Sequence, residues 1–179
     1  MLSIVLIAIV VIIAALLALA ATKPDTFRIE RSAIINTSPD KVFGLIEDFH
    51  RWNGWSPWEK LDPAMMRTFT GAASGKGAIY EWEGNKKVGK GRMEIADLES
   101  HSQIRIKLDF FSPFEAHNIA EFTLENRGNS VYLKWAMFGP ASFAVKVMHL
   151  FMNMDKMVGK DFETGLANLK SLAENSPTE

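Results

Sequence analysis

The segment that most resembles a catalytic motif is Gly71-Ala72-Ala73-Ser74-Gly75-Lys76, which is similar to a phosphate-binding loop. Such a loop needs four residues between its glycines, and this segment has three. Gly77 stands where a Ser or Thr would bind the metal, and a strand pattern follows in place of a helix. We therefore interpret residues 71–77 as a glycine-rich turn before a strand.

Metal and acid–base chemistry would need histidines, cysteines or carboxylates at short spacings. His50, His101, His117 and His149 are scattered along the chain, and it contains no cysteine. Glu115 shares a predicted strand face with His117, but no third ligand accompanies them. His50 is a candidate base, although a lone histidine beside an aromatic helix more often serves packing or solvation. The sequence predicts no catalytic residue, no metal site and no cofactor.

Aromatic side chains are the best candidates for binding chemistry. Trp52, Trp55 and Trp58 are three of the five tryptophans, and they recur at every third residue of HRWNGWSPWEK. Rings of this size bury much area in cores and can also grip an apolar ligand. We expect Trp55 to pack inward under the preceding helix, and its two neighbours to face a cavity or its rim.

The charge balance argues against one class of partner. The 179 residues carry 20 Lys and Arg against 21 Asp and Glu, a formal net charge of −1. Nucleic-acid recognition normally needs a clear basic excess, so we expect no nucleic-acid partner. Lys86, Lys87, Lys90 and Arg92 form the densest basic cluster, which we interpret as a solvated hairpin, with contact to anionic lipid headgroups as the alternative.

An uninterrupted apolar segment occupies the N-terminus. Residues 2–21 have no ionisable side chain, and a helix of about 20 residues matches the roughly 30 Å hydrocarbon core of a bilayer. The run is longer than the apolar region of a usual signal peptide, and no basic residue precedes it, so residues 1–22 are interpreted as a transmembrane anchor. Ala18-Leu19-Ala20 resembles a signal-peptidase site, so a cleaved signal peptide with an exported or periplasmic domain stays open.

Beyond this segment, residues 23–26 are a polar linker, residues 27–174 one domain and residues 175–179 a disordered tail. Lys23, Arg28 and Arg31 follow the apolar run, and the positive-inside tendency then favours a cytoplasmic domain on a single-pass membrane protein.

Period-two alternation predicts an antiparallel sheet, with Gly- and Asn-rich turns between its strands. The predicted strands lie near residues 27–35, 78–83, 92–96, 104–110, 120–125 and 131–137. A helix is predicted to begin at Ser38-Pro39-Asp40, a second short helix covers residues 51–55, and a spacing of three and four predicts one long helix over residues 142–173. The expected fold class is therefore α+β, a curved antiparallel sheet wrapped around a long C-terminal helix.

A bent sheet that holds a helix across its opening rarely fills completely, so a cavity is expected between them. Methionines suit irregular apolar cavities because their thioether chains are flexible. The aromatic and methionine side chains predicted to bind the ligand are Trp52, Trp55, Trp58, Tyr80, Trp82, Phe110, Phe122, Trp135, Met137, Met148, Phe151 and Met152.

The order of elements and the runs SPDKVFGLIEDFHRWNGWSPW, GKGAIYEWEG, VGKGRMEI and VGKDFETGLANLK resemble the SRPBCC superfamily, and within it the polyketide cyclase/dehydrase-like branch. The resemblance covers about residues 27–174. It implies a helix-grip fold, like that of START-like and pollen-allergen-like domains, with a deep pocket for lipids, polyketides or other apolar compounds. A minority of members are cyclases or hydrolases, and no catalytic residue set of the superfamily matches positions here.

Two functions of different classes stay open. The first is a membrane-tethered domain that binds an apolar small molecule or lipid. The second is a cyclase/dehydratase-type enzyme acting on an aromatic or polyketide substrate. Few polar residues fall on predicted core faces, which favours binding over catalysis. The sequence indicates no oligomeric state.

Overall fold

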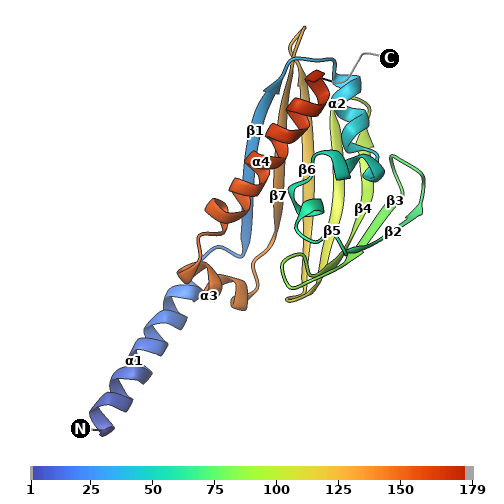
Figure 1. The fold of residues 1–179 in the computed structure, drawn as a ribbon. Coiled ribbons are helices and arrows are strands. Elements are labelled where there is room, and N and C mark those ends of the chain that lie inside the picture. Colours follow the sequence, from blue (N-terminus) through green and yellow to red (C-terminus); the bar gives the residue numbers. More distant parts are fainter. Residues whose placement is uncertain (1, 176–179) are drawn as a thin grey trace.

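Seven antiparallel strands form one curved sheet in the computed structural model, which describes residues 2–175 (Figure 1). They are β1 (Thr26–Ile35), β2 (Met66–Gly71), β3 (Ala78–Glu83), β4 (Lys90–Glu99), β5 (Gln103–Ser112), β6 (Ala116–Asn126) and β7 (Val131–Pro140). The order across the sheet is β1-β7-β6-β5-β4-β3-β2. The strands from β2 to β7 therefore form a meander, and β1 joins it beside β7.

The helices are α1 (Leu2–Ala21), α2 (Pro39–Ile46), α3 (Phe143–Phe151) and α4 (Met154–Asn175), with two 3-10 helices, η1 (Phe49–Gly54) and η2 (Pro57–Lys60). The sheet curves around α4, which packs along β1, and α2 contacts both α4 and β6 (Figure 1). This confirms the α+β helix-grip fold and the N-terminal apolar helix predicted from the sequence.

The strand pattern follows burial on one face of the sheet. In β3, Ala78, Tyr80 and Trp82 are buried, whereas Glu81 and Glu83 are exposed. This alternation places one row of side chains in the core and the other in solvent. The sequence analysis missed β2 because this edge strand exposes nearly all of its residues, so its sequence carries no alternation.

The single C-terminal helix expected over residues 142–173 is instead two helices with a break at Met152 and Asn153. Met152 adopts an extended backbone, and its N–H closes the last turn of α3 on Met148. The side chain of Asn153 accepts a hydrogen bond from Lys156 N at 2.9 Å, which caps the first turn of α4. The apolar spacing continues through the break, so periodicity alone did not reveal it.

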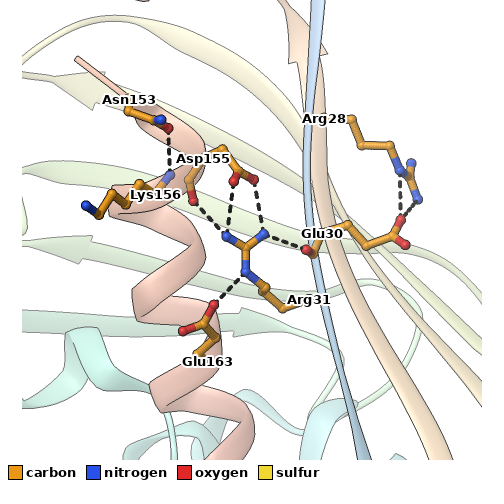
Figure 2. A network of polar contacts seen from close by, with 7 residues as sticks. All are labelled: Arg28, Glu30, Arg31, Asn153, Asp155, Lys156 and Glu163. Carbon is orange, nitrogen blue, oxygen red and sulfur yellow. Dashed lines mark hydrogen bonds and ion pairs between the residues drawn. The ribbon is translucent and has the colours of Figure 1, made fainter.

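Arg31 of β1 holds the first half of α4 against the sheet (Figure 2). Its Nε donates to Glu163 at 2.7 Å, and its terminal nitrogens donate to the carboxylate of Asp155 at 3.0 and 3.1 Å. The guanidinium lowers the pKa of the Asp155 carboxyl through these hydrogen bonds. A Cβ at Gly159 would collide with the same guanidinium, so only glycine leaves room for the arginine to cross the helix.

The apolar helix α1 is long and apolar enough to cross a membrane over Ser3–Ala21, a criterion that a signal sequence near the N-terminus can also meet. Its C-terminal end packs against α3, where Ala20 is fully buried. Asp25 continues this junction, because its side chain pairs with Lys146 of α3 and its backbone carbonyl accepts a hydrogen bond from Ala141 N at 2.7 Å.

The C-terminal tail is predicted to be disordered over residues 175–179. Asn175 is instead the last residue of α4, and residues 176–179 lie outside the described part of the chain.

A pair of glycine variants tests the packing of α4 against the sheet. In Gly165→Ala the new Cβ would lie 2.8 Å from the Trp135 ring and 3.2 Å from Pro57, so we expect the free energy of unfolding to fall by about 1–3 kcal/mol. In Gly44→Ala the Cβ meets no atom within 4 Å, so alanine's better helix propensity should raise it by up to about 1 kcal/mol. Denaturant unfolding of the full chain in detergent measures both. Equal changes in the free energy of unfolding for Gly165→Ala and Gly44→Ala would contradict the close packing of Gly165 against Trp135 and Pro57.

Candidate functional site

A cavity of about 380 Å³ lies between the inner face of the sheet and α4. The sheet strands, η1, η2 and the first half of α4 each contribute to its wall. The lining side chains are mostly aromatic or aliphatic, and they are Trp52, Ser56, Trp58, Glu59, Leu61, Met65, Tyr80, Trp82, Lys87, Val88, Met93, Leu108, Phe110, Ala120, Trp135, Met137, Met157, Val158, Asp161 and Phe162.

An aromatic stack joins the sheet to α4 on one side of the cavity. Trp135 of β7 lies parallel to Phe162 of α4, with ring centroids 4.1 Å apart, and its ring stacks on Phe122 of β6 at 4.9 Å. Trp58 of η2 meets Trp135 and Phe162 edge-on at 5.8 and 6.2 Å. Stacked and edge-on rings are the favoured aromatic geometries, so these side chains hold one another in fixed positions.

The three clustered tryptophans have different surroundings. Trp52 Nε1 donates to Ile46 O at 2.9 Å and Trp55 Nε1 to Leu45 O at 3.0 Å. Both carbonyls belong to the last turn of α2, whose carbonyls have no partner within the helix, so the two indoles cap it. Trp55 is fully buried outside the cavity wall, whereas Trp52 lines the cavity while capping. Trp58 lines it and stays half-buried.

One buried polar cluster interrupts the apolar wall. The carboxylate of Glu59 accepts hydrogen bonds from Tyr80 Oη and from Arg67 Nε, both at 2.6 Å. Arg67 also donates to the backbone carbonyls of Glu59 and Met65. Burial and the hydrogen bond to Glu59 raise the pKa of the Tyr80 phenol, so it acts as a donor and stays protonated. The cluster neutralises its own charge, which is what allows a carboxylate to line an apolar cavity.

Asp161 of α4 is a second carboxyl in the wall. Burial raises the pKa of its side chain. Lys87, Leu61 and Met157 also line the cavity, and all three are exposed. These three mark the mouth of the cavity, between the β3–β4 turn and the first turn of α4.

The other motifs considered in the sequence lie elsewhere. Residues 71–77 form the β2–β3 turn, in which Ala72 N donates to Gly77 O at 3.1 Å, as the turn interpretation predicted. His50 stacks on Phe69, and His117 pairs with Asp109 and Glu115 on the protein surface. Within residues 2–175, no three His, Asp or Glu side chains are placed to hold a metal ion.

The cavity wall includes seven of the twelve side chains predicted to bind the ligand, namely Trp52, Trp58, Tyr80, Trp82, Phe110, Trp135 and Met137. Trp55 and Phe122 are fully buried behind the wall and support it. Met148, Phe151 and Met152 belong to α3 and its end, and they do not line the cavity. Their selection assumed a continuous helix, and the break at Met152 and Asn153 separates them from the sheet.

The sequence analysis did not select the rest of the wall. Val158 and Phe162 lie on the helical apolar stripe, and Met93 and Ala120 on buried strand faces, so periodicity carried a signal for them. The polar members Ser56, Glu59 and Asp161 had no such signal, because only the folded chain brings them to the cavity.

Comparisons with known proteins agree with the fold. The family described as polyketide cyclase/dehydrase and lipid transport matches residues 26–174. Among solved structures, protein CV1439 of Chromobacterium violaceum is 16% identical, with a TM-score of 0.59 over 86% of this chain and 100% of that one. Major latex-like protein 151 of Panax ginseng is 9% identical, with a TM-score of 0.59 over 83% and 97%. The Aha1 dimer of Colwellia psychrerythraea is 14% identical, with a TM-score of 0.58 over 85% and 99%.

These matches confirm the resemblance to the SRPBCC superfamily, and the solved structures share its fold. A search of curated proteins found no match.

Two tryptophan variants separate the cavity wall from its support. Trp55→Ala removes a fully buried ring and a cap of α2, so we expect the free energy of unfolding to fall by about 3–5 kcal/mol. Trp58→Ala removes a half-buried ring of the wall, so we expect a loss of about 1–2 kcal/mol and a clear loss of bound apolar ligand. Denaturant unfolding and native mass spectrometry measure the two effects. A larger loss of stability in Trp58→Ala than in Trp55→Ala, together with ligand loss in Trp55→Ala alone, would overturn this distinction.

Proposed function

The chain belongs to the polyketide cyclase/dehydrase and lipid transport family, and from this premise we propose that it is a membrane-tethered protein that binds a lipid or polyketide-like molecule in its cavity. The observation that carries the proposal is the apolar cavity between the sheet and α4. Its volume of about 380 Å³ falls within the size of small-molecule sites, about 300–1,000 Å³.

The composition of the wall supports an apolar ligand with little polar surface. Aromatic rings and methionines surround the cavity, and burial of apolar ligand surface against them is the main favourable term. The Glu59–Arg67–Tyr80 cluster satisfies its own hydrogen bonds, so it offers a ligand at most a small polar contact. A phosphate or another multiply charged group has no matching cation in the described wall except Lys87, at the mouth.

The tether is α1. Its apolar length fits a bilayer, and α3 and Asp25 fix its end to the domain. A signal sequence would be cleaved away and would not need this packed junction, which favours a retained anchor. The basic residues Lys23, Arg28 and Arg31 after α1 favour a cytoplasmic domain.

A cyclase/dehydratase-type enzyme is the second candidate, and Asp161 is the observation that favours it. A carboxyl whose pKa is raised by burial at the wall of an apolar cavity is suited to exchange a proton with a bound substrate. The binding function has the stronger support, because Glu59, the other carboxylate of the wall, already accepts hydrogen bonds from Arg67 and Tyr80.

Filling the cavity tests the binding function. Ala120→Phe places a ring in the cavity, so we expect native mass spectrometry of the gently extracted full chain to show less co-purifying lipid or other apolar molecule than the parent chain. Ala167→Phe makes the same change at an exposed position of α4 and should leave the ligand in place. Parent protein with no bound molecule, or equal loss in both variants, would reject the proposal.

Asp161→Asn separates the two candidates. The change keeps the shape of the side chain and removes its proton exchange, so a binding protein should retain its ligand at close to the parent occupancy. An enzyme should instead lose turnover of a polyketide-like substrate by about 100-fold or more, the usual contribution of a general acid or base. Measurable turnover by the parent chain that disappears in Asp161→Asn would favour the enzyme over the binding protein.

A further inference from the structure

Exposed apolar side chains gather at the end of the domain from which α1 emerges. Outside α1, every exposed phenylalanine of the described residues except Phe69 lies there. We call the group the apolar rim, and its members with their exposed fractions are Phe111 (47%), Phe114 (74%), Phe143 (50%), Phe151 (68%) and Met152 (42%). Isolated exposed hydrophobic residues need no explanation, whereas a gathered group of aromatic rings marks an interaction surface.

Two elements carry the apolar rim. One is α3, which packs on the C-terminal end of α1. The other is the β5–β6 hairpin, whose tip bears Phe111 and Phe114. The β3–β4 turn touches this hairpin, since Gly89 lies directly against Ser112. Figure 1 shows α3 and the tips of both hairpins at the lower end of the domain, which is also the end from which α1 leaves.

The exposed ends of α3 carry the phenylalanine rings Phe143 and Phe151. Its sequence FAVKVMHLF contains only Lys146 and His149 as ionisable residues. Lys146 is buried against the junction with α1, where its charge is paired with Asp25. A helix whose exposed rings have no partner in water gains free energy when those rings enter the boundary between headgroups and acyl chains.

Basic charge accompanies the apolar rim at the β3–β4 turn. The four-residue basic cluster of the sequence does not act as a unit, because Lys90 pairs with Glu83 and Arg92 with Glu94. Lys86 and Lys87 are exposed, and none of the ion pairs between described residues includes either of them. They are therefore available to anionic headgroups beside the aromatic hairpin tip.

We propose that the apolar rim lies in the surface of the bilayer that α1 crosses, so that the mouth of the cavity opens onto the membrane and takes its ligand directly from it. The position of the mouth supports this, because Met157 lies in the first turn of α4, close in sequence to Met152 of the rim, and Lys87 lies in the β3–β4 turn. This inference rests on the proposed function, since it assumes that α1 is retained in a membrane and that the cavity holds an apolar ligand.

The chain has no native cysteine, so single-cysteine variants carry one label each and test the depth of each position. The variants are Phe114→Cys and Phe151→Cys in the rim, Val11→Cys in α1 as the membrane reference, and Ile34→Cys as the control. Ile34 is 48% exposed and lies at the far end of β1, away from α1. Each full-length labelled protein is reconstituted into vesicles that contain phospholipids brominated along their acyl chains, and quenching of the fluorescent label is measured.

We expect quenching at positions 114 and 151 to exceed that at position 34 by about threefold or more, because an interfacial segment sits about 5–10 Å into the headgroup and acyl boundary. Quenching at position 11 together with equal, weak quenching at 114, 151 and 34 would overturn the rim while leaving the tether intact. Labels at 114 and 151 that are shielded from an aqueous quencher but not quenched by bromine would indicate a second copy of the chain on the rim, which also overturns it.

The cavity assay with Ala120→Phe reports separately on ligand binding. If the labels at positions 114 and 151 are quenched no more than the label at position 34, and the parent chain still holds its ligand, only the proposal that the cavity mouth faces the membrane is rejected. No quenching even at position 11 rejects the tether and the rim together, and leaves ligand occupancy as the measure of the binding function.

Discussion

The contact between Trp135 and Phe162 is the interaction on which the rest of the structure depends. It joins the inner face of the sheet to α4 through two parallel rings 4.1 Å apart, and Phe122 supports the other side of Trp135. Trp135 Nε1 has no hydrogen-bond partner within residues 2–175. An unpaired buried donor costs about 1–3 kcal/mol, so the packing of the rings has to offset that cost. Trp135 and Phe162 also line the cavity, so the contact that joins the sheet to α4 forms part of the cavity wall.

Two further contacts determine the shape of that cavity. Arg31 ties the first half of α4 to β1, which holds Val158 and Asp161 at the wall. The indoles of Trp52 and Trp55 bind the free carbonyls at the end of α2, which positions the short helices over the open end of the sheet. Aromatic residues that cap one helix therefore also build the wall of the cavity. The three tryptophans therefore differ in role: Trp55 is buried in the core, whereas Trp52 and Trp58 line the cavity.

The fold could be predicted because its main elements have clear periods. Alternation in β3 to β7 and the stripe of α4 follow burial directly, and the resemblance to the SRPBCC superfamily supplied the arrangement. The edge strand β2 and the break before α4 could not be predicted from periodicity, since the first is exposed on nearly every residue and the second depends on the cap formed by Asn153. For the same reason a continuous helix would place Met148 and Phe151 at the cavity, whereas they lie on α3, which packs against α1. Polar wall residues such as Glu59 could not be predicted, because only the folded chain brings Tyr80 and Arg67 within hydrogen-bond distance of its carboxylate.

The proposed function requires an apolar molecule in the cavity between the sheet and α4. The most direct measurement is nuclear Overhauser contact between methyl-labelled methionines of the full chain in lipid nanodiscs and the acyl protons of the lipid. Met93 and Met137 are buried in the cavity wall, so we expect contacts from their methyl groups to ligand chain protons. Contacts from Met93 and Met137 to protein protons alone, with lipid contacts confined to exposed methionines such as Met152, would contradict it.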